Sequence, residues 1–362
     1  MTVVKVTVND VAREANVSPA TVSRVFNKNP NISEETRELV LKTAAKLGYK
    51  PRVRKSEGRE SSKKNIAIVF NNRLSSLTDD PFYGQVIAGI EQIVSHKNYN
   101  LFFRTVTGHL NSDLERIETL ISDEKLAGII LAGYEIDEQL VKQIKKNNLP
   151  LVLVDSNLYD ENVNMILNDN TTGARAAVDY LITLGHRRIA FVGGPLNHTS
   201  LDERYIGYKQ ALRRAGIKKN EEYITFCKPR FDAEDGYRAT LAMLKSCNPM
   251  PTAIFAANDM LAIGAMRAVF ELGLSIPHDI SVVGFDDISM AQHTIPQLTT
   301  VRIQKHEMGM MAAKRLLELI DEPEAKPIKV IVGVELVVRD SVAERKDNST
   351  VQDVLLKTEA HA

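Results

Sequence analysis

From residue 65 onward, short apolar runs alternate with amphipathic segments, and this alternation restricts the fold more than any other feature of the chain. The first apolar runs cover residues 66–70, 101–103, 128–131 and 151–154. The segments between them, which have apolar residues at helical spacing, cover 84–96, 113–122 and 138–147. Repeated strand–helix units of about 25–30 residues place parallel strands side by side with helices on both faces. The sequence therefore predicts an α/β fold built on a doubly wound parallel sheet.

A second series of the same kind follows the first. Its strand-like runs cover residues 165–167, 189–192, 253–256 and 281–284. Its predicted helices cover 172–184, 202–214, 234–244 and 260–272. Gly185 and Gly273 follow two of these helices, at the position where glycine commonly ends a helix. One architecture used twice predicts two similar α/β lobes with a cleft between them, and we expect a further helix over 305–320 and a final strand over 328–338.

The first 50 residues follow a different pattern, which predicts two short helices joined by a sharp turn. Thr7 and Asp10 are placed to cap the first helix, Asn16 tolerates the left-handed conformation of a sharp exit, and Ser18 is placed to cap the second helix. The second helix turns inward its apolar residues Val22, Val25 and Phe26. Its outward residues are Pro19, Ala20, Thr21, Ser23, Arg24 and Asn27. This pattern predicts a helix-turn-helix, whose second helix enters the DNA major groove.

The charge distribution distinguishes this helix pair from an ordinary helical hairpin. Residues 1–64 contain 14 Lys and Arg against 7 Asp and Glu, whereas the remainder contains 32 against 39, although the whole chain balances 46 against 46. A basic head joined to an acidic body is expected of a nucleic-acid-binding protein. A third helix is predicted from its N-cap Ser33 to Gly48, with Glu34 and Glu35 in its first turn. Three short helices complete a small N-terminal domain.

Several other classes of protein are not favoured by the sequence. We expect no membrane span and no secretory signal, because no run of 18 apolar residues occurs and the N-terminus lacks an apolar region. Cys227 and Cys247 have no CxxC spacing, so we expect buried or neutral thiols in a reducing cytoplasm. The eight histidines show no HExxH motif, and Walker A and GxGxxG motifs are absent, so we expect neither a metal site nor a cofactor.

The sequence of the head resembles a known family. The stretches DVAREANVSPATVSRVFN and ISEETRELVLKTAAKLGYKP are similar to the head domain of the lactose-repressor/galactose-repressor family of bacterial transcription regulators. The resemblance extends to about residue 341, and it implies the type I periplasmic-binding-protein fold for the two lobes, with the last helix and strand crossing back between them. We therefore expect a DNA-binding domain over 1–50, a basic hinge over 51–64, a two-lobed effector-binding and dimerisation domain over 65–341, and a flexible tail over 342–362.

The linker departs from the family pattern. In the family this segment becomes a hinge helix on operator binding, with an Ala-Arg pair and a leucine that opens the minor groove. Here those positions hold Lys55, Ser56 and Gly58, and glycine weakens a helix and cannot unstack a base step. We expect the linker to contribute salt-dependent attraction to phosphates rather than a sharp kink. The tail lacks sustained heptads, which predicts a dimer rather than a tetramer.

Residue chemistry divides the expected DNA contacts into two kinds. Hydroxyls and amides suit phosphates, and these are Ser18, Thr21, Ser23 and Asn27. Pro19 and Ala20 suit a thymine methyl group, and Arg24 suits guanine. The predicted contact set is completed by Thr7, Ser33, Thr36, Arg52, Arg54 and Lys55.

The effector site is expected where the strands of both lobes end, because ligands of open α/β sheets bind at the carboxyl ends of strands. The predicted effector-binding residues are Phe82, Tyr83, Asp155, Arg204, Phe231, Asn258 and Asp286. The resemblance matches Arg204, Asn258 and Asp286 most cleanly, with Asp155 and Phe231 next. Asn168, Asp169 and Asp259 also follow strands, but a helix N-cap is an equally good interpretation of Asn168 and Asp259.

These features together predict a transcription regulator that represses by binding a pseudo-palindromic operator as a homodimer, under the control of a small effector. The aromatic, carboxylate, amide and guanidinium groups favour a mono- or disaccharide. A purine or nucleoside, or a phosphorylated partner protein, remains an alternative effector. A sugar-binding protein without gene regulation is a second hypothesis, and an enzyme using Asp155, Asp259 and Asp286 is a third, although no nucleophile–base motif accompanies them.

Overall fold

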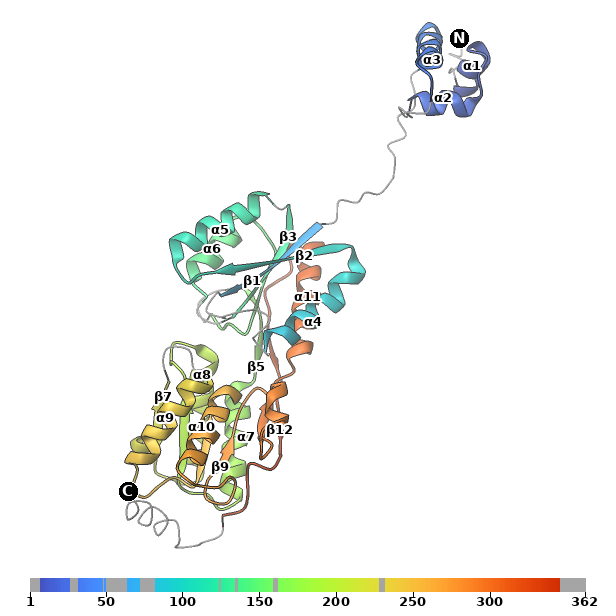
Figure 1. The fold of residues 1–362 in the computed structure, drawn as a ribbon. Coiled ribbons are helices and arrows are strands. Elements are labelled where there is room, and N and C mark those ends of the chain that lie inside the picture. The colour runs from blue at the N-terminus through green and yellow to red at the C-terminus, as the bar shows by residue number, and fades with distance from the viewer. Residues whose placement is uncertain are drawn as a thin grey trace. The chain divides into compact units, whose positions relative to one another are not determined.

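The computed structural model describes residues 7–26, 32–47, 49, 64–71, 82–123, 125–133, 136–158, 162–227 and 232–345. The chain forms two compact units, Met1–Ser62 and Lys63–Ala362, which are drawn in Figure 1. The linker 51–63 and the tail beyond 345 lie outside the described residues, and so do the predicted contact residues Asn27, Arg52, Arg54, Lys55 and Phe231. No described helix is both long enough and apolar enough to span a membrane.

The described part of the N-terminal unit contains three short helices, α1 (Val8–Glu14), α2 (Pro19–Phe26) and α3 (Glu34–Lys46). Their shared core consists of Val11, Ala12, Ala15, Val22, Val25, Val40 and Ala44. Asn16 has a φ of 49°, and the Ser18 hydroxyl accepts a hydrogen bond from the Thr21 backbone N–H at 3.0 Å. The predicted sharp exit from α1 and the predicted N-cap of α2 are therefore both confirmed.

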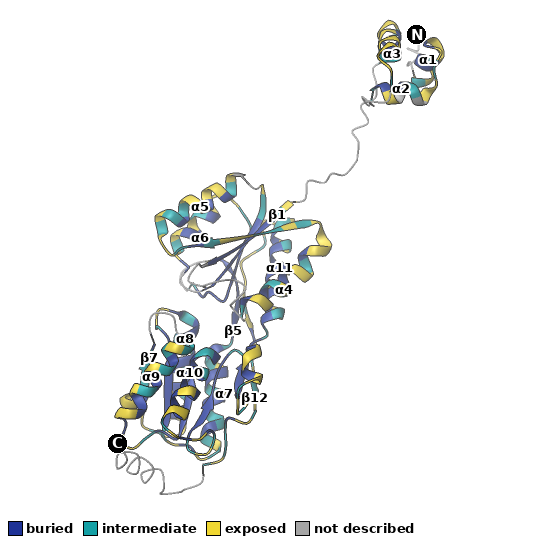
Figure 2. Cartoon of the chain, in the orientation of Figure 1, coloured by how far each residue is buried: buried dark blue, intermediate teal, exposed yellow. Residues whose placement is uncertain are grey.

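The first lobe of the larger unit is a six-stranded parallel sheet in the order β11-β5-β4-β3-β1-β2. Its strands are β1 (Lys64–Asn71), β2 (Tyr99–Val106), β3 (Leu126–Ala132), β4 (Leu151–Val154), β5 (Asn164–Asn168) and β11 (Lys329–Val332). Its helices are α4 (Tyr83–Val94), η1 (Ser95–Lys97), α5 (Leu110–Asp123) and α6 (Glu138–Lys146). The order of these elements confirms the predicted strand–helix alternation. Residues of the central strands are fully buried under the helices (Figure 2).

The second lobe is a four-stranded parallel sheet in the order β7-β6-β8-β9. Its strands are β6 (Ile189–Gly193), β7 (Ile224–Phe226), β8 (Ala253–Ala256) and β9 (Ser281–Val283). Its helices are α7 (Asn170–Thr183), α8 (Thr199–Arg214), η2 (Glu221–Tyr223), α9 (Ala233–Ser246), α10 (Asp259–Glu271) and η3 (Ser289–Gln292). Gly185 and Gly273 have φ values of 88° and 72°, which explains glycine after α7 and α10.

Two predictions about strands are wrong. The run 165–167 forms β5 but belongs to the first lobe, where it pairs with β4. The single strand expected over 328–338 is two strands: β11 pairs with β5, whereas β12 (Glu335–Val337) pairs antiparallel with β10 (Thr300–Arg302). A run of apolar residues does not specify its partner strand, so sequence periodicity cannot assign either strand to a sheet. The crossing of this segment between the lobes, which the resemblance implied, is confirmed.

Helix α11 (Lys305–Asp321) follows β10 and packs against α4 of the first lobe. Glycines make this contact very close. A Cβ atom on Gly309 would lie 2.0 Å from the Val86 carbonyl oxygen, and a Cβ atom on Gly89 would lie 2.0 Å from the His306 carbonyl oxygen. Because the obstructing atoms are backbone, neither helix has room for a side chain at these positions.

We expect Gly309→Ala to lower the free energy of unfolding by about 1–3 kcal/mol, because the helices must separate to admit the methyl group. Urea denaturation of the full chain measures this loss. The matched control is Gly84→Ala on α4, where an added Cβ has no heavy atom within 4 Å. Helix propensity makes the control neutral or stabilising by about 0.5–1 kcal/mol. Equal effects of the two substitutions would contradict the close packing of α4 and α11.

Candidate functional site

The outward face of α2 carries the predicted DNA-contacting side chains. Ser18, Pro19 and Arg24 are exposed, and Thr21 is half-buried with its hydroxyl 2.8 Å from that of Ser18. Ser33 and Thr36 repeat this hydroxyl pair at the start of α3, also at 2.8 Å. The backbone of Ala20 and Ser23 belongs to α2, but their side chains lie outside the described part of the structure. The described hydroxyls therefore cluster at two helix N-termini, where backbone N–H groups favour anions.

Arg24 differs in its charge environment from three other cations of the head. Arg13 pairs with Asp10 at 2.9 Å, Arg37 pairs with Glu34 at 3.4 Å, and Lys46 pairs with Glu14 at 3.1 Å. Helix α2 contains no acidic residue, and among the described residues no hydrogen bond or ion pair holds Arg24. Its guanidinium is therefore available to a ligand outside the head. Thr7 instead donates both its backbone N–H and its hydroxyl to Asp10, at 2.9 and 2.7 Å, and the backbone bond is the one that the predicted pairing with Asp10 requires.

In the larger unit, Asp155 collects hydrogen bonds from both lobes. It follows β4 in a left-handed conformation, with a φ of 57°, and its side chain is buried. Its carboxylate accepts from the hydroxyls of Tyr83 at 3.2 Å and Ser200 at 3.0 Å, and from the Asn168 amide at 3.3 Å. Burial raises the pKa of Asp155 to about 6, although the nearby Arg204 opposes this rise.

Arg204 is the central cation of the second lobe and is only 3% exposed. Its guanidinium pairs with Asp286 at 2.9 Å, donates to the Ala257 carbonyl at 2.7 Å and stacks 3.9 Å from the centre of the Phe285 ring. Its Nε donates to the Asn170 amide oxygen at 3.0 Å. A cation so enclosed binds groups in a fixed orientation, because the guanidinium is planar and cannot rotate away.

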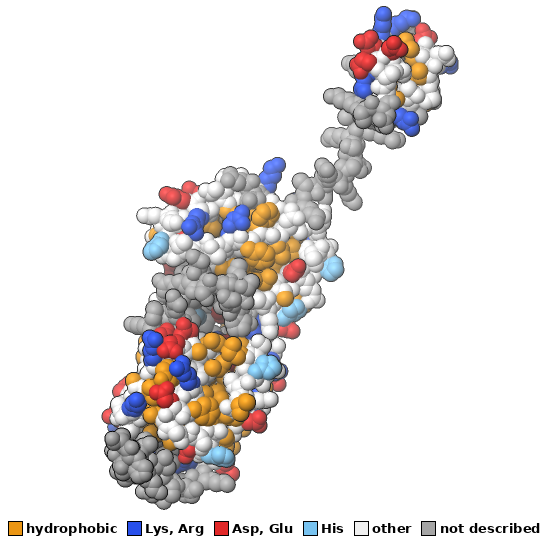
Figure 3. Space-filling view, in the orientation of Figure 1, with side chains coloured by type: hydrophobic (Ala, Val, Ile, Leu, Met, Phe, Trp, Pro, Cys, Tyr) orange, Lys and Arg blue, Asp and Glu red, His pale blue; other side chains and the backbone are white. Residues whose placement is uncertain are grey.

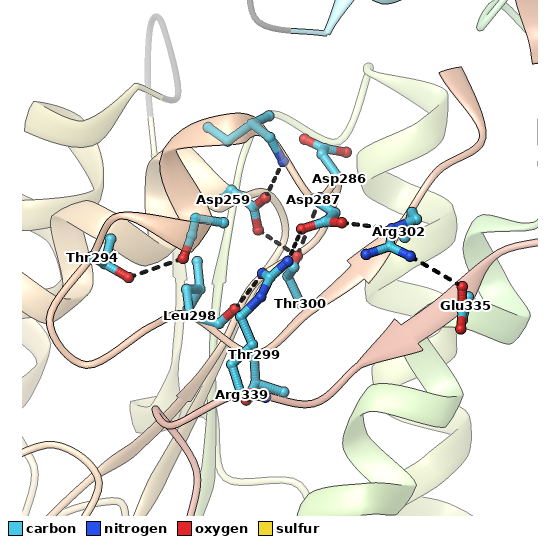
Figure 4. A network of polar contacts seen from close by, with 12 residues as sticks. Asp259, Asp286, Asp287, Thr294, Leu298, Thr299, Thr300, Arg302, Glu335 and Arg339 are labelled. Atoms are coloured by element: carbon cyan, nitrogen blue, oxygen red, sulfur yellow. Dashed lines mark hydrogen bonds and ion pairs between the residues drawn. The ribbon is translucent and has the colours of Figure 1, made fainter. Parts of the chain in front are cut away.

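Asp259 and Asp287 belong to a network of polar contacts that also includes Asp286 (Figure 4). Asp259 is fully buried and accepts from the Thr300 hydroxyl at 2.5 Å and the Ile288 N–H at 2.8 Å. Burial, with Asp286 nearby, raises the pKa of Asp259. The buried Lys305 amine donates to the carbonyl oxygens of Asp286 and Asp287. Lys305 is the first residue of α11, so this network anchors α11 to the loop that carries Asp286.

Asp287, the residue after Asp286, is held by two arginines. Arg302 donates to it at 2.7 Å and Arg339 at 2.5 Å, and Arg302 also lies 3.4 Å from Glu335 (Figure 4). The hydrogen bonds and charges of both arginines lower the pKa of Asp287 against the effect of its own burial. These bonds fix the backbone of the loop that carries Asp286.

The structure brings together four of the predicted effector-binding residues: Tyr83 with Asp155, and Arg204 with Asp286. Phe82 is half-buried, with its ring centre 4.9 Å from that of Tyr83, and the Lys305 amine lies 5.8 Å from the Phe82 ring. Asn258 is the N-cap of α10, because its side chain accepts from the Leu261 N–H at 2.7 Å. Capping therefore accounts for that contact of Asn258, whereas Asp259 is not the cap.

Sequence reasoning missed several polar residues around this group. It did not single out Ser200, Asn170 and Lys305, and each bonds to a predicted residue or to its backbone. The capping interpretation of Asn168 is wrong, because Asp169 is the N-cap of α7; Asn168 ends β5, is 3% exposed, and its Oδ1 has no hydrogen-bond partner among the described residues. The helix pattern signals Ser200 alone, since it lies one turn before Arg204 on α8.

Other titratable groups lie away from the exposed surface. Cys227 and Cys247 are buried free thiols, as predicted, and burial raises the pKa of Cys227 to about 12 and raises that of Cys247. His198, just before α8, is buried, and this burial lowers its pKa to about 3, assisted by Arg204. Among the described residues, no group of three or more His, Cys, Asp or Glu side chains is arranged to hold a metal ion.

The pKa of Asp155 predicts a pH-dependent stability. A carboxyl whose folded-state pKa lies above its ordinary value of 3.8 stabilises the fold while protonated, and this stabilisation is lost as the pH rises through about 6. Asparagine at this position cannot titrate. We therefore expect the free energy of unfolding of Asp155→Asn, relative to the natural chain, to rise by up to about 3 kcal/mol between pH 4 and pH 7.5.

Urea denaturation of both chains at several pH values measures this difference. Any effect of the substitution that does not depend on pH shifts the whole curve and cancels in the slope, whereas the hydrogen bonds from Ser200 and Tyr83 are already part of the pKa of about 6. A difference that stays constant across the range would show that the Asp155 carboxyl does not titrate in this window.

Comparisons with known proteins agree with this geometry. Residues 7–52 match the family model of bacterial regulatory proteins of the lacI family, and residues 178–342 match that of the periplasmic binding protein-like domain. The chain is 37% identical over 338 residues to the probable HTH-type transcriptional repressor ExuR of Bacillus subtilis (strain 168). These residues cover 93% of this chain and 98% of that protein.

Two solved structures share the fold over nearly the whole chain. The complex of the transcriptional regulator CelR with cellobiose has a TM-score of 0.71 and 29% identity, covering 93% of this chain and all of that one. The lac repressor dimer bound to operator and the anti-inducer ONPF has a TM-score of 0.68 and 29% identity, covering 94% of this chain and all of that one. The resemblance seen in the sequence is confirmed, and the chain belongs to the lacI family of bacterial regulatory proteins.

Proposed function

We propose that the protein is a homodimeric transcriptional repressor of a pseudo-palindromic operator. Its affinity for the operator rises or falls when a mono- or disaccharide binds between its lobes. The observation that carries this proposal is the grouping of the buried Asp155 and Arg204 with the half-buried Asp286, near the carboxyl ends of strands. Asp155 follows β4 of the first lobe and Asp286 follows β9 of the second, while Arg204 on α8 pairs with Asp286.

The chemistry of this set suits a neutral sugar. Each sugar hydroxyl both donates and accepts, so it matches carboxylates on one side and a guanidinium or amide on the other. The pairing of Arg204 with Asp286 neutralises its charge, which removes the unpaired cation that a phosphorylated ligand requires. The Asn168 Oδ1, which is buried without a partner among the described residues, supplies one more acceptor. The aromatic ring of Phe82, close to that of Tyr83, suits the apolar face of a sugar ring.

The surface supports assembly of two copies. Figure 3 shows apolar side chains gathered in two patches, one over β2 of the first lobe and one around α10 of the second. Phe103 on β2 and Phe270 on α10 are 40% and 45% exposed. Exposed apolar patches of this kind mark protein–protein contact surfaces. A twofold dimer places two copies of α2 on successive half-sites, which is the geometry that a pseudo-palindromic operator needs.

Control by the sugar requires that it binds one arrangement of the lobes better than the other. Because residues of both lobes contribute to the Asp155 cluster, a sugar held there contacts both lobes at once. The sugar then changes operator affinity by the same factor as the operator changes sugar affinity, and its preference between the two arrangements sets the upper bound of that factor.

We expect Arg24→Ala to weaken operator binding by about 1–3 kcal/mol and to relax the preference at one base position of each half-site. The exposed guanidinium of Arg24 has no partner among the described residues of the head, so it is available for guanine. Binding to a duplex selected from random sequences with the purified protein, and to its single-base variants, measures both effects. The control is Arg13→Ala, since Asp10 already holds that arginine. An equal loss on every sequence would assign Arg24 to phosphate contact instead.

The effector is tested by a thermal-shift screen of monosaccharides, disaccharides and nucleosides with the full chain. We expect a sugar to raise the melting temperature and to change the affinity for the selected duplex at least about fivefold, a coupling within the usual range. Asp286→Asn is expected to lose the shift, whereas Glu324→Gln on the exposed surface keeps it. Stabilisation by nucleosides alone would contradict a sugar effector, and a stabilising sugar without effect on DNA binding would contradict control of the operator.

A further inference from the structure

A chain of hydrogen bonds leads from the candidate effector site to the junction between the lobes. Arg204 donates through Nε to the Asn170 side-chain oxygen at 3.0 Å. The Asn170 side-chain amide in turn donates to Glu203 Oε2 at 3.0 Å. Glu203 and Arg204 are consecutive residues of α8, so they point to different sides of the helix. Asn170 therefore links Arg204, which pairs with Asp286, to Glu203 on another side of the same helical turn.

The other oxygen of Glu203 reaches the first lobe. Glu203 Oε1 accepts from the Asn157 amide at 3.1 Å, and the Asn157 oxygen accepts from the Lys329 amine at 2.7 Å. Asn157 lies between β4 and β5, and Lys329 begins β11, so both belong to the first lobe. Glu203 is thus bonded at one oxygen to the first lobe and at the other to the first residue of α7.

The orientation of both amides is determined by their partners. Arginine and lysine only donate hydrogen bonds, and a carboxylate only accepts them. Asn170 must therefore turn its oxygen to Arg204 and its nitrogen to Glu203, and Asn157 must turn its oxygen to Lys329 and its nitrogen to Glu203. Cations stand at both ends of the chain and the Glu203 carboxylate stands in the middle. Asn157, Asn170, Glu203 and Lys329 all line one open pocket of about 120 Å³.

We propose that Glu203 is a positioning residue that holds the two lobes in one arrangement, and that Asn170 links this hold to Arg204. A ligand that accepts from Arg204 competes with Asn170 for the guanidinium N–H groups, and weakening of the Arg204–Asn170 bond lets the Asn170 amide turn away from Glu203 and alters the hydrogen bond between Glu203 and Asn157. The inference rests on the proposed function in taking Arg204 as an effector contact, but the hold of Glu203 on the first lobe acts without effector or DNA.

The test measures the distance between the lobes in the full chain, free of sugar and DNA. Lys97→Cys on the first lobe and Lys245→Cys on the second replace exposed residues and accept a fluorescent donor and acceptor, whereas the two natural cysteines are buried. Labelled protein is mixed with excess unlabelled protein, so that energy transfer occurs within one chain. Single-molecule transfer efficiencies then report the arrangement of the lobes.

We expect Glu203→Gln to shift the mean transfer efficiency and to broaden its distribution, because glutamine offers one acceptor where two amides donate. Asn157→Ala, which leaves the Asn170–Glu203 bond intact, is expected to give a shift in the same direction. Asn170→Asp still accepts from Arg204 but cannot donate to Glu203, so the same shift is expected. Asp202→Asn makes the same change of acid to amide one residue earlier on α8, and its distribution should coincide with that of the natural chain.

Coincidence of folded Glu203→Gln and Asn157→Ala with the natural chain would overturn the proposal, and cooperative thermal unfolding establishes that they are folded. Asn157→Ala alone decides the matter if Glu203→Gln does not fold. A shift in these two but not in Asn170→Asp would overturn the link to Arg204. Failure of every sugar to bind would refute the proposed function and leave these distributions unchanged, so the two failures are distinguishable.

Discussion

The ion pair between the buried Arg204 and the half-buried Asp286 joins α8 to the loop after β9, and the polar contacts of the candidate site are arranged around it. Removing one partner of such a pair costs about 3–5 kcal/mol, because the remaining charge stays buried without compensation. The neighbouring groups are arranged around this constraint. Asn170, Ala257 and Phe285 enclose the guanidinium, and the two bonds from Lys305 fix the backbone of the loop that carries Asp286. A site built in this way is rigid before any ligand arrives, so little binding energy is lost in ordering it.

Helix α8 distributes three functions over little more than one turn. Ser200 bonds to Asp155 of the first lobe, Glu203 bonds to Asn157 and Asn170, and Arg204 pairs with Asp286. Successive residues of a helix are rotated by about 100°, so a single rigid element contacts the first lobe, the interlobe junction and the candidate effector site at once. A small rotation of α8 therefore changes all three contacts together, which is the behaviour expected of a two-state switch.

Much of this fold follows from the sequence, because strand–helix alternation and helix caps are local signals. Residue type and position predict a cap partner at Asp10, a left-handed helix exit at Asn16 and an N-cap at Ser18, and the structure confirms all three. The partner strand of β5 and the division of β11 from β12 do not follow, since pairing depends on distant segments. Asp155 and Arg204 can be found because they stand at strand ends or match the family, whereas Asn170 and Lys305 matter through contacts across 34 and 19 residues, which no local pattern records.

The glycine contact between α4 and α11 has a mechanical consequence. With backbone against backbone at Gly89 and Gly309, the two helices cannot slide past each other, so α11 travels with the first lobe as one solid body. Its first residue, Lys305, nevertheless donates hydrogen bonds to the carbonyl oxygens of Asp286 and Asp287 in the second lobe. A relative rotation of the lobes must therefore either break the contacts of Lys305 or carry the loop of Asp286 along with α11, so the N-terminus of α11 couples movement of the first lobe to the candidate site.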